Sequence, residues 1–200
     1  APALPGVINN SGIMKWQSTY RIYGRGNNDA GATINNLPGG VFDIAQDGDP
    51  LDYEGGNATC VFNNQGRIVK SAGAGSSGLG NLWRFNNEPA AVIHNAVAGS
   101  RFSRGSNSPT LWKSGSVLRG PGIIGLDGGE ITGENGSWTI ESAATFDLAG
   151  ATLACPQSGS LALSPSGDST LLWNSGTIHG ILNIPSGTTL LMPAGGYYKT

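Results

Sequence analysis

One short phrase recurs along the chain and constrains its fold more than any other feature. The phrase has an apolar residue, two polar residues that are usually Asn-Asn, a variable residue, Gly or Pro at its fifth position, and another apolar residue. Four copies begin Ile8-Asn9-Asn10, Ile34-Asn35-Asn36, Phe62-Asn63-Asn64 and Phe85-Asn86-Asn87. Two later copies begin Leu111-Trp112-Lys113 and Leu172-Trp173-Asn174. The first residues are spaced by 26, 28, 23, 26 and 61 residues, and the last gap fits two repeats with a degenerate copy around Trp138.

Each repeat has the composition of a strand, a turn and a second strand. Val, Ile, Leu, Phe and Thr favour strands, and Gly, Asn and Ser, abundant here with 33 Gly in the chain, favour turns. One repeat cannot bury its own apolar face, but stacked repeats can. We therefore predict an all-β fold, a single-stranded right-handed parallel β-helix of about 7 to 8 irregular coils. Residues 1–200 form one domain, with Asn-Asn coils in 1–100 and more degenerate coils in 101–200.

The alternation of side chains along a strand assigns the repeated residues to faces. The apolar first position is expected to point inward, and Trp83, two residues before Phe85, shares that face. The same reasoning turns Trp112 and Trp173 outward, where they are candidates for contact with a glycan or a protein partner. Covering a turn is the alternative for both. The repeated Asn residues either stack as a ladder of side-chain amides or simply favour the turns.

Two cysteines, Cys60 and Cys155, are 95 residues apart. In a solenoid they lie about four coils apart, roughly 19 Å if coils stack at the strand spacing. A disulfide needs Cα atoms within about 7 Å. The repeat therefore predicts two free, buried thiols.

The Asn-Asn-x-Gly-x-[Ile/Val] phrase, followed by strands such as Gly176-Thr177-Ile178 and Gly187-Thr188-Thr189-Leu190, resembles the repeats of large bacterial surface proteins. These include the parallel β-helix passengers of autotransporters and the filamentous-haemagglutinin-like adhesins. The resemblance covers most of the chain and rests on the style of the repeat. It implies a right-handed parallel β-helix and a role at the cell surface.

The charge and hydropathy of the sequence limit the kinds of partner and location that we expect. The net charge is −2 and the Lys and Arg residues are scattered, so nothing favours nucleic acid. No apolar segment approaches the roughly 18 residues of a membrane span. Low charge and the abundance of Gly, Asn and Ser favour an extracellular or cell-surface protein. The N-terminal residues lack the basic and apolar regions of a signal peptide, as expected of a mature end or a boundary within a longer protein.

A cluster of five carboxylates is the one candidate for a metal site. Asp43 and the four residues Asp47, Asp49, Asp52 and Glu54 lie within 12 positions. Ca²⁺ takes several oxygen ligands from a flexible loop, so Asp47, Asp49, Asp52 and Glu54 are candidate calcium ligands. A solvated acidic loop is the alternative. Paired carboxylates could also serve glycoside hydrolysis, although no second acidic cluster faces them.

No other pattern indicates catalysis or a cofactor. Gly-x-Gly-x-x-Gly occurs at Gly73–Gly78 and Gly120–Gly125, but neither match is followed by a helix-forming sequence, so both are interpreted as turns. His94 and His179 show no metal-ligand spacing with the cysteines and are expected to be exposed. No Gly-x-Ser-x-Gly elbow is present. We expect no catalytic residues and no cofactor other than calcium.

Three functions remain from these observations. The first is an extracellular structural or adhesive solenoid that builds a fibre, stalk or filament. It would associate end to end with other protomers, or with other surface proteins, because we find no capping helix at either end. The second is a polysaccharide-binding module that uses Trp112 and Trp173. The third is a polysaccharide-active enzyme on the same scaffold with its carboxylates in the Asp43–Glu54 region, since fold alone does not decide function.

Overall fold

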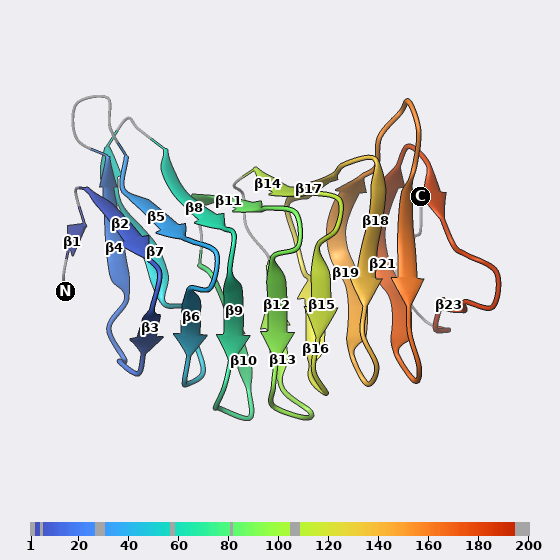
Figure 1. Ribbon diagram of the computed structural model, residues 1–200, viewed down its shortest axis with the longest axis horizontal. Coiled ribbons are helices and arrows are strands. Elements are labelled where there is room, and N and C mark those ends of the chain that lie inside the picture. The colour runs from blue at the N-terminus through green and yellow to red at the C-terminus, as the bar shows by residue number, and fades with distance from the viewer. Residues whose placement is uncertain are drawn as a thin grey trace.

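The chain winds into coils that stack along one axis, so strands from successive coils lie side by side (Figure 1). The structure is a computed structural model that describes residues 3–4, 6–26, 31–56, 59–80, 82–104 and 109–194. Within these residues every strand pairing is parallel, and no helix is present. The predicted all-β solenoid is confirmed.

One side of the stack is an eight-stranded sheet that takes one strand from each coil. Its strands, in spatial order, are β3 (Ile13–Trp16), β6 (Val41–Ile44), β9 (Arg67–Lys70), β12 (Val92–Asn95), β15 (Val117–Arg119), β18 (Gly136–Ile140), β20 (Leu161–Pro165) and β22 (Leu182–Asn183). Spatial order follows chain order, as a solenoid requires.

The other sides belong mainly to a twelve-stranded sheet that turns a corner. One part contains β2 (Val7–Asn10), β5 (Thr33–Asn36), β8 (Cys60–Asn64), β11 (Trp83–Asn87), β14 (Thr110–Trp112) and β17 (Glu130–Gly133). The other contains β10 (Ser76–Gly78), β13 (Arg101–Ser103) and β16 (Ile123–Leu126). The ten-residue strand β19 (Thr145–Ala154) joins the parts, because its first half pairs with β16 and its last residues pair with β17. Beyond it lie β21 (Thr170–His179) and β23 (Leu190–Leu191).

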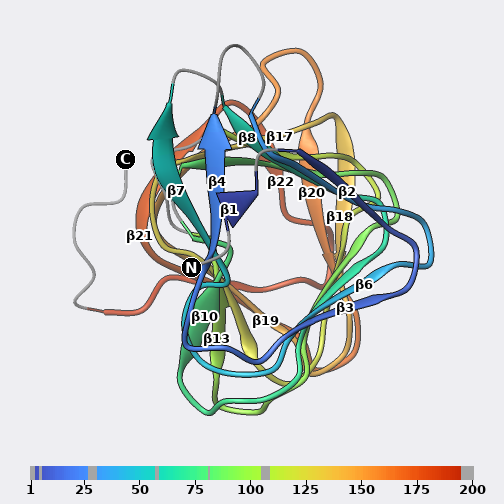
Figure 2. The same ribbon diagram turned by 90° about the vertical axis from the view of Figure 1, so that its left-hand side faces the viewer.

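A separate three-stranded sheet extends the side of the first coils. It contains β1 (Ala3–Leu4), β4 (Ile22–Gly26) and β7 (Leu51–Gly56). Seen along the stacking axis, the strands surround a common interior (Figure 2).

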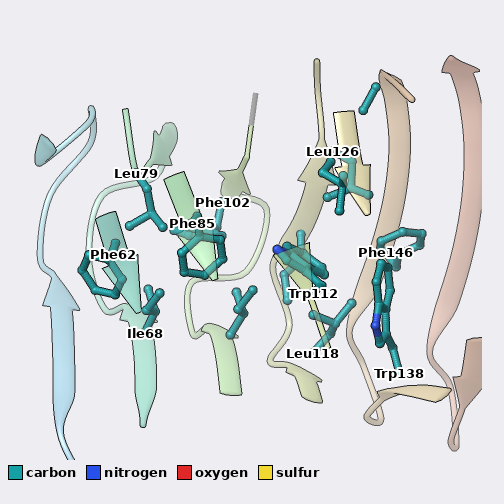
Figure 3. Close-up of a cluster of buried hydrophobic side chains, with 14 of the residues drawn as sticks. Phe62, Ile68, Leu79, Phe85, Phe102, Trp112, Leu118, Leu126, Trp138 and Phe146 are labelled. Atoms are coloured by element: carbon teal, nitrogen blue, oxygen red, sulfur yellow. The ribbon is translucent and has the colours of Figure 1, made fainter. Parts of the chain in front are cut away.

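Apolar side chains from all sides fill that interior. Phe62 lies between Phe42 and Phe85, with ring centroids 5.1 and 5.9 Å away. Further along the axis, Trp112 packs on Trp138 at 5.0 Å (Figure 3). Each Å² of apolar surface that such a column buries contributes about 25 cal/mol to stability, and this burial holds neighbouring coils together. Trp83 is 1% exposed, which confirms its predicted inward position.

Two ladders of Asn side chains run along the stack at the turn between the two large sheets. The second Asn of each phrase points inward, and Asn10, Asn36 and Asn64 each donate from Nδ2 to the Oδ1 of the next coil's Asn at 2.8, 2.8 and 2.7 Å. The first Asn points outward, and Asn35, Asn63 and Asn86 each donate to the preceding coil's Asn at 2.8, 2.8 and 2.7 Å. The predicted amide ladder is therefore confirmed, and it is double.

Both cysteines are free and buried, as the repeat predicts. Burial raises the pKa of the Cys60 thiol and raises that of Cys155 to about 11. No helix among the described residues has the length and apolar character needed to cross a membrane.

Candidate functional site

The outward position predicted for Trp112 and Trp173 is wrong. Trp112 is fully buried in the core against Trp138, and Trp173 is partly buried and packs on the same core. The Trp173 indole Nε1 donates to the Gly176 carbonyl at 3.3 Å. Trp112 has no exposed face on which a sugar could stack, and Trp173 uses part of its ring to pack on the core, so the two do not form the exposed aromatic pair that the predicted glycan or partner contact needs.

The error is a shift of one residue in register. Asn87 pairs with Trp112 and Phe85 pairs with Thr110, so Thr110 rather than Leu111 continues the inward apolar column. In the later copy, Leu171 is buried and Leu148 pairs with Trp173. A shift of one residue moves every side chain of a strand to the opposite face.

The predicted acidic cluster is largely paired with basic side chains. Asp47 accepts a hydrogen bond of 2.8 Å from Lys70 Nζ and bonds of 3.0 Å from the Gly75 amide to both of its oxygens, and these contacts lower its pKa. Asp52 lies 2.7 Å from Arg21 Nη1, and Glu54 lies 3.2 Å from an Arg25 guanidinium nitrogen.

Asp43, which belongs to the same cluster of five carboxylates, lies 3.6 Å from Lys15 Nζ. Asp49 and Asp47 border a groove of about 340 Å³ beside Trp16 and Arg21. Within the described part of the chain, no three His, Cys, Asp or Glu side chains gather as metal ligands would. Calcium binding by Asp47, Asp49, Asp52 and Glu54 stays a prediction, and three of the four, Asp47, Asp52 and Glu54, are each paired with a basic side chain.

The prediction that the two glycine-rich matches are turns holds only for their first residues, because each match ends inside a strand. Gly73–Gly78 includes strand β10 and Gly120–Gly125 includes most of strand β16, so neither supplies the helix N-terminus that a dinucleotide site needs. His179 is exposed as expected, but His94 is half-buried and its Nδ1 is enclosed without a hydrogen-bond partner. Burial lowers the His94 pKa, and the nearby positive charges of Arg67 and Arg119 lower it further.

A polar network that sequence patterns did not indicate joins four coils on the side of β13, β16, β19 and β21. Arg101 donates from Nη1 to Asp147 at 2.8 Å and from Nε to both oxygens of Asp127 at 3.0 and 2.9 Å. Its guanidinium lies over Gly125, where an added Cβ would come within 2.1 Å of Nη2. Asp147 is 4% exposed and also accepts a bond of 2.7 Å from Asn174 Nδ2. With every carboxylate oxygen engaged in this way, the network stabilises the stack rather than forming a reactive centre.

The first coil resembles an interior coil from which one neighbour has been removed. In the described residues, β2 pairs only with β5 and β3 only with β6, so one backbone edge of each is open. Ile8 and Met14 belong to the inward columns yet are only partly buried. Val7, Ile13 and Tyr20 of this coil are 63%, 74% and 69% exposed.

The last described coil also has open strand edges and apolar side chains that are only partly buried. Among the described strands, β22 pairs only with β20 and β23 only with β21. Leu182, Ile184 and Leu190 are partly buried against the core. Ile181, Leu191 and Met192 are 47%, 46% and 59% exposed.

The last coil also lacks charge, because residues 169–194 contain no Asp, Glu, Lys or Arg. Proteins usually protect exposed strand edges with charged side chains, particularly Lys, which prevent another strand from pairing there. An apolar edge without that protection favours pairing with another strand. The absence of charge is visible in the sequence and is the signal by which this surface could have been found.

No known protein-family profile, curated protein or solved structure matches this chain.

Proposed function

We propose that this protein is a structural and adhesive β-solenoid of the extracellular space or cell surface, and that it builds a fibre, stalk or filament by end-to-end association of protomers. The resemblance of its repeats to those of autotransporter passengers and filamentous-haemagglutinin-like adhesins supports the surface location. The same resemblance supports an adhesive rather than a catalytic role.

The distribution of exposed apolar side chains carries this proposal. Seven large apolar side chains are exposed among the described residues, and six of them belong to the first and last coils. Leu82 is the exception, part-way along the stack. Isolated apolar side chains are normal on a protein surface, but apolar groups gathered at open strand edges favour association.

The two ends are different surfaces, so contact between them is head to tail. A head-to-tail contact that does not close into a ring continues into a filament. Coils of the next protomer would then add parallel rungs to the large sheets and cover Ile8, Met14 and Leu190.

Sedimentation velocity of the 200-residue chain over a wide concentration range tests the association. We expect the mean sedimentation coefficient to rise with concentration and to persist at high salt, because the last coil carries no charge. The variant Leu191→Lys should weaken association at least about tenfold, since it places a charge in an apolar contact.

Leu82→Lys is the matched control, because both leucines are 46% exposed. It should associate like the unmodified protein. A chain that stays monomeric at every concentration would refute the proposal, and so would equal weakening by the two substitutions.

A further inference from the structure

A shallow groove of about 310 Å³ lies on the outer surface where the eight-stranded sheet meets the turns. It is lined by Gly39, Gly40, Val41, Gln65, Gly66, Arg67, Ala90, Val92 and Arg119. The residues come from four successive coils, so the groove runs along the stacking axis and crosses the rungs.

The groove exists because the stacked turns have no room for side chains. An added Cβ at Gly40 would come within 2.3 Å of the Asn10 carbonyl oxygen, and one at Gly66 within 2.3 Å of the Gly40 carbonyl oxygen. Close stacking of the Asn-Asn coils therefore keeps this corner bare. Val41 and Val92, whose side chains point outward from β6 and β12, supply an apolar floor beside it.

Positive charge borders this apolar floor. Arg67 lies between Val41 and Val92 in the same outward column, is exposed, and makes no side-chain hydrogen bond or ion pair within the described residues. Arg119 lies one coil further along and is bound by Glu141 through two bonds of 2.5 and 2.7 Å. Arg67 is therefore the guanidinium available to a ligand, while Arg119 is already held in place.

Half-buried His94 lies in the same excess of positive charge. Its neighbours in the outward column are Val69 on β9 and Arg119 on β15, with Arg67 and Glu141 close enough to affect its charge. Asp43, on the far side of Val69, is paired with Lys15. An anion in the groove would partly offset the two guanidinium charges that act on His94.

We propose that this groove binds an acidic saccharide, with a carboxylate of the sugar on Arg67 and the C–H face of the ring on Val41 and Val92. A guanidinium matches a carboxylate through two parallel hydrogen bonds, and one free arginine suits one carboxylate per sugar better than a densely sulfated chain. The bare turns let a ring approach the backbone closely. Nucleic acid needs many basic contacts along its phosphates, which a chain of net charge −2 with scattered cations does not offer.

This site lies on the side of the stack and deepens the adhesive part of the proposed function. It is independent of end-to-end association, because none of its residues belongs to the first or last coil. A chain that fails to form filaments could still bind the saccharide, and the reverse also holds, so the two tests fail separately.

Isothermal titration calorimetry with an oligogalacturonate tests the site directly. We expect binding that weakens as salt is raised, and no binding of the methyl-esterified oligomer of equal length, which lacks the charge. Arg67→Ala should reduce affinity at least about tenfold, the range of one charge-assisted hydrogen-bonded pair. Arg84→Ala is the matched control, because Arg84 is also exposed on a strand and makes no side-chain bond to a described residue. It should bind like the unmodified protein.

Two further probes separate the alternatives. A sulfated oligosaccharide and a poly-glutamate of similar length should both bind more weakly than the oligogalacturonate. Stronger binding of either would overturn the assignment to a carboxylated sugar, as would equal losses in the two arginine variants or no binding at all. In NMR titrations, the bound oligogalacturonate should raise the pKa of His94 and leave exposed His179 unchanged, and an unchanged His94 would place the ligand elsewhere.

Discussion

Asn36 donates a hydrogen bond of 2.8 Å from its Nδ2 to the Oδ1 of Asn64, and both side chains are fully buried. Asn64 Nδ2 donates in turn to Asn87 Oδ1, and Asn87 Nδ2 donates to Ser116 Oγ at 2.9 Å. The outer ladder runs in the opposite direction, from Asn86 back to Asn9. The amide dipoles of the two ladders therefore oppose each other, and the buried bonds of the stack lie in the inner ladder.

Removing one inner amide should cost more than removing one outer amide. Asn64→Ala leaves Asn87 Oδ1 without its donor inside the protein and should lower the free energy of unfolding by about 2 to 3 kcal/mol. Asn63→Ala acts on a half-buried position where water replaces the lost bonds, so about 1 kcal/mol or less is expected. Urea unfolding of both variants measures the difference, and equal costs would contradict the assignment of inner and outer faces.

Trp112 should behave as a core residue. Trp112→Ala removes a buried indole that packs on Trp138 and should lower the free energy of unfolding by about 3 to 5 kcal/mol. Trp173→Ala should cost less, because that ring is only partly buried. Thermal unfolding of the two variants tests the ranking, and a Trp112 variant as stable as the parent would place the ring outside.

The Arg101 network predicts unequal losses at its two carboxylates. Arg101→Met leaves Asp147, 4% exposed, with Asn174 as its remaining partner and should cost about 3 to 5 kcal/mol, the range for breaking a buried ion pair. Asp127→Asn changes the exposed partner and should cost about 1 kcal/mol or less. Similar losses in chemical denaturation would show that Asp147 is not the partner that matters.

Both thiols should be unreactive in the folded protein. Burial raises the pKa of Cys60, and raises that of Cys155 to about 11, so little thiolate is present at pH 8. Ellman's reagent should label neither cysteine natively and both after unfolding in urea. A missing thiol after unfolding would reveal a Cys60–Cys155 disulfide and would contradict the stacking of the coils.

Acid should remove the contribution of Glu141. Its hydrogen bonds to Arg119 lower its pKa below the ordinary value of 4.5, so the stabilisation is present above that value and is lost as the pH falls through the lower folded pKa. The Glu141 side chain is 35% exposed, so solvent limits the effect to about 1 kcal/mol or less. Glu141→Gln should be less stable than the parent at pH 7 and equally stable at pH 2. A difference that persists at pH 2 would point to lost packing instead.

The repeated phrase was sufficient to predict the fold and the first half of the core. Phe62 and Phe85 lie in one column because their coils keep the Asn-Asn pair in register. Trp83 follows from alternation along the same strand. In these coils local pattern and stacking agree, so the sequence alone places the side chains.

The register of the Trp-containing copies could not be predicted, because the turns differ in length. Two residues separate Asn64 from Arg67, but four separate Asn87 from Val92, and Arg67 pairs with Val92. Counting to the Gly or Pro therefore does not fix the register. Gly115 occupies the left-handed position of Gly39 and Ala90, at φ of 84°, 83° and 63°, which places Trp112 opposite Asn87.

Contacts between distant coils could not be predicted from the sequence either. Arg101 and Asp147 are 46 residues apart, and their meeting depends on the lengths of the two intervening coils. The groove at Arg67 requires bare turns and the column formed with Val41 and Val92, which only the three-dimensional register shows.

Negative-stain electron microscopy of the chain across a concentration series tests the central claim most directly, namely that the solenoid builds larger structures through its ends. We expect rods of constant width whose lengths increase by whole subunits as concentration rises, with Leu191→Lys giving short rods under the same conditions. Particles of a single subunit's length at every concentration, or growth in width instead of length, would contradict it.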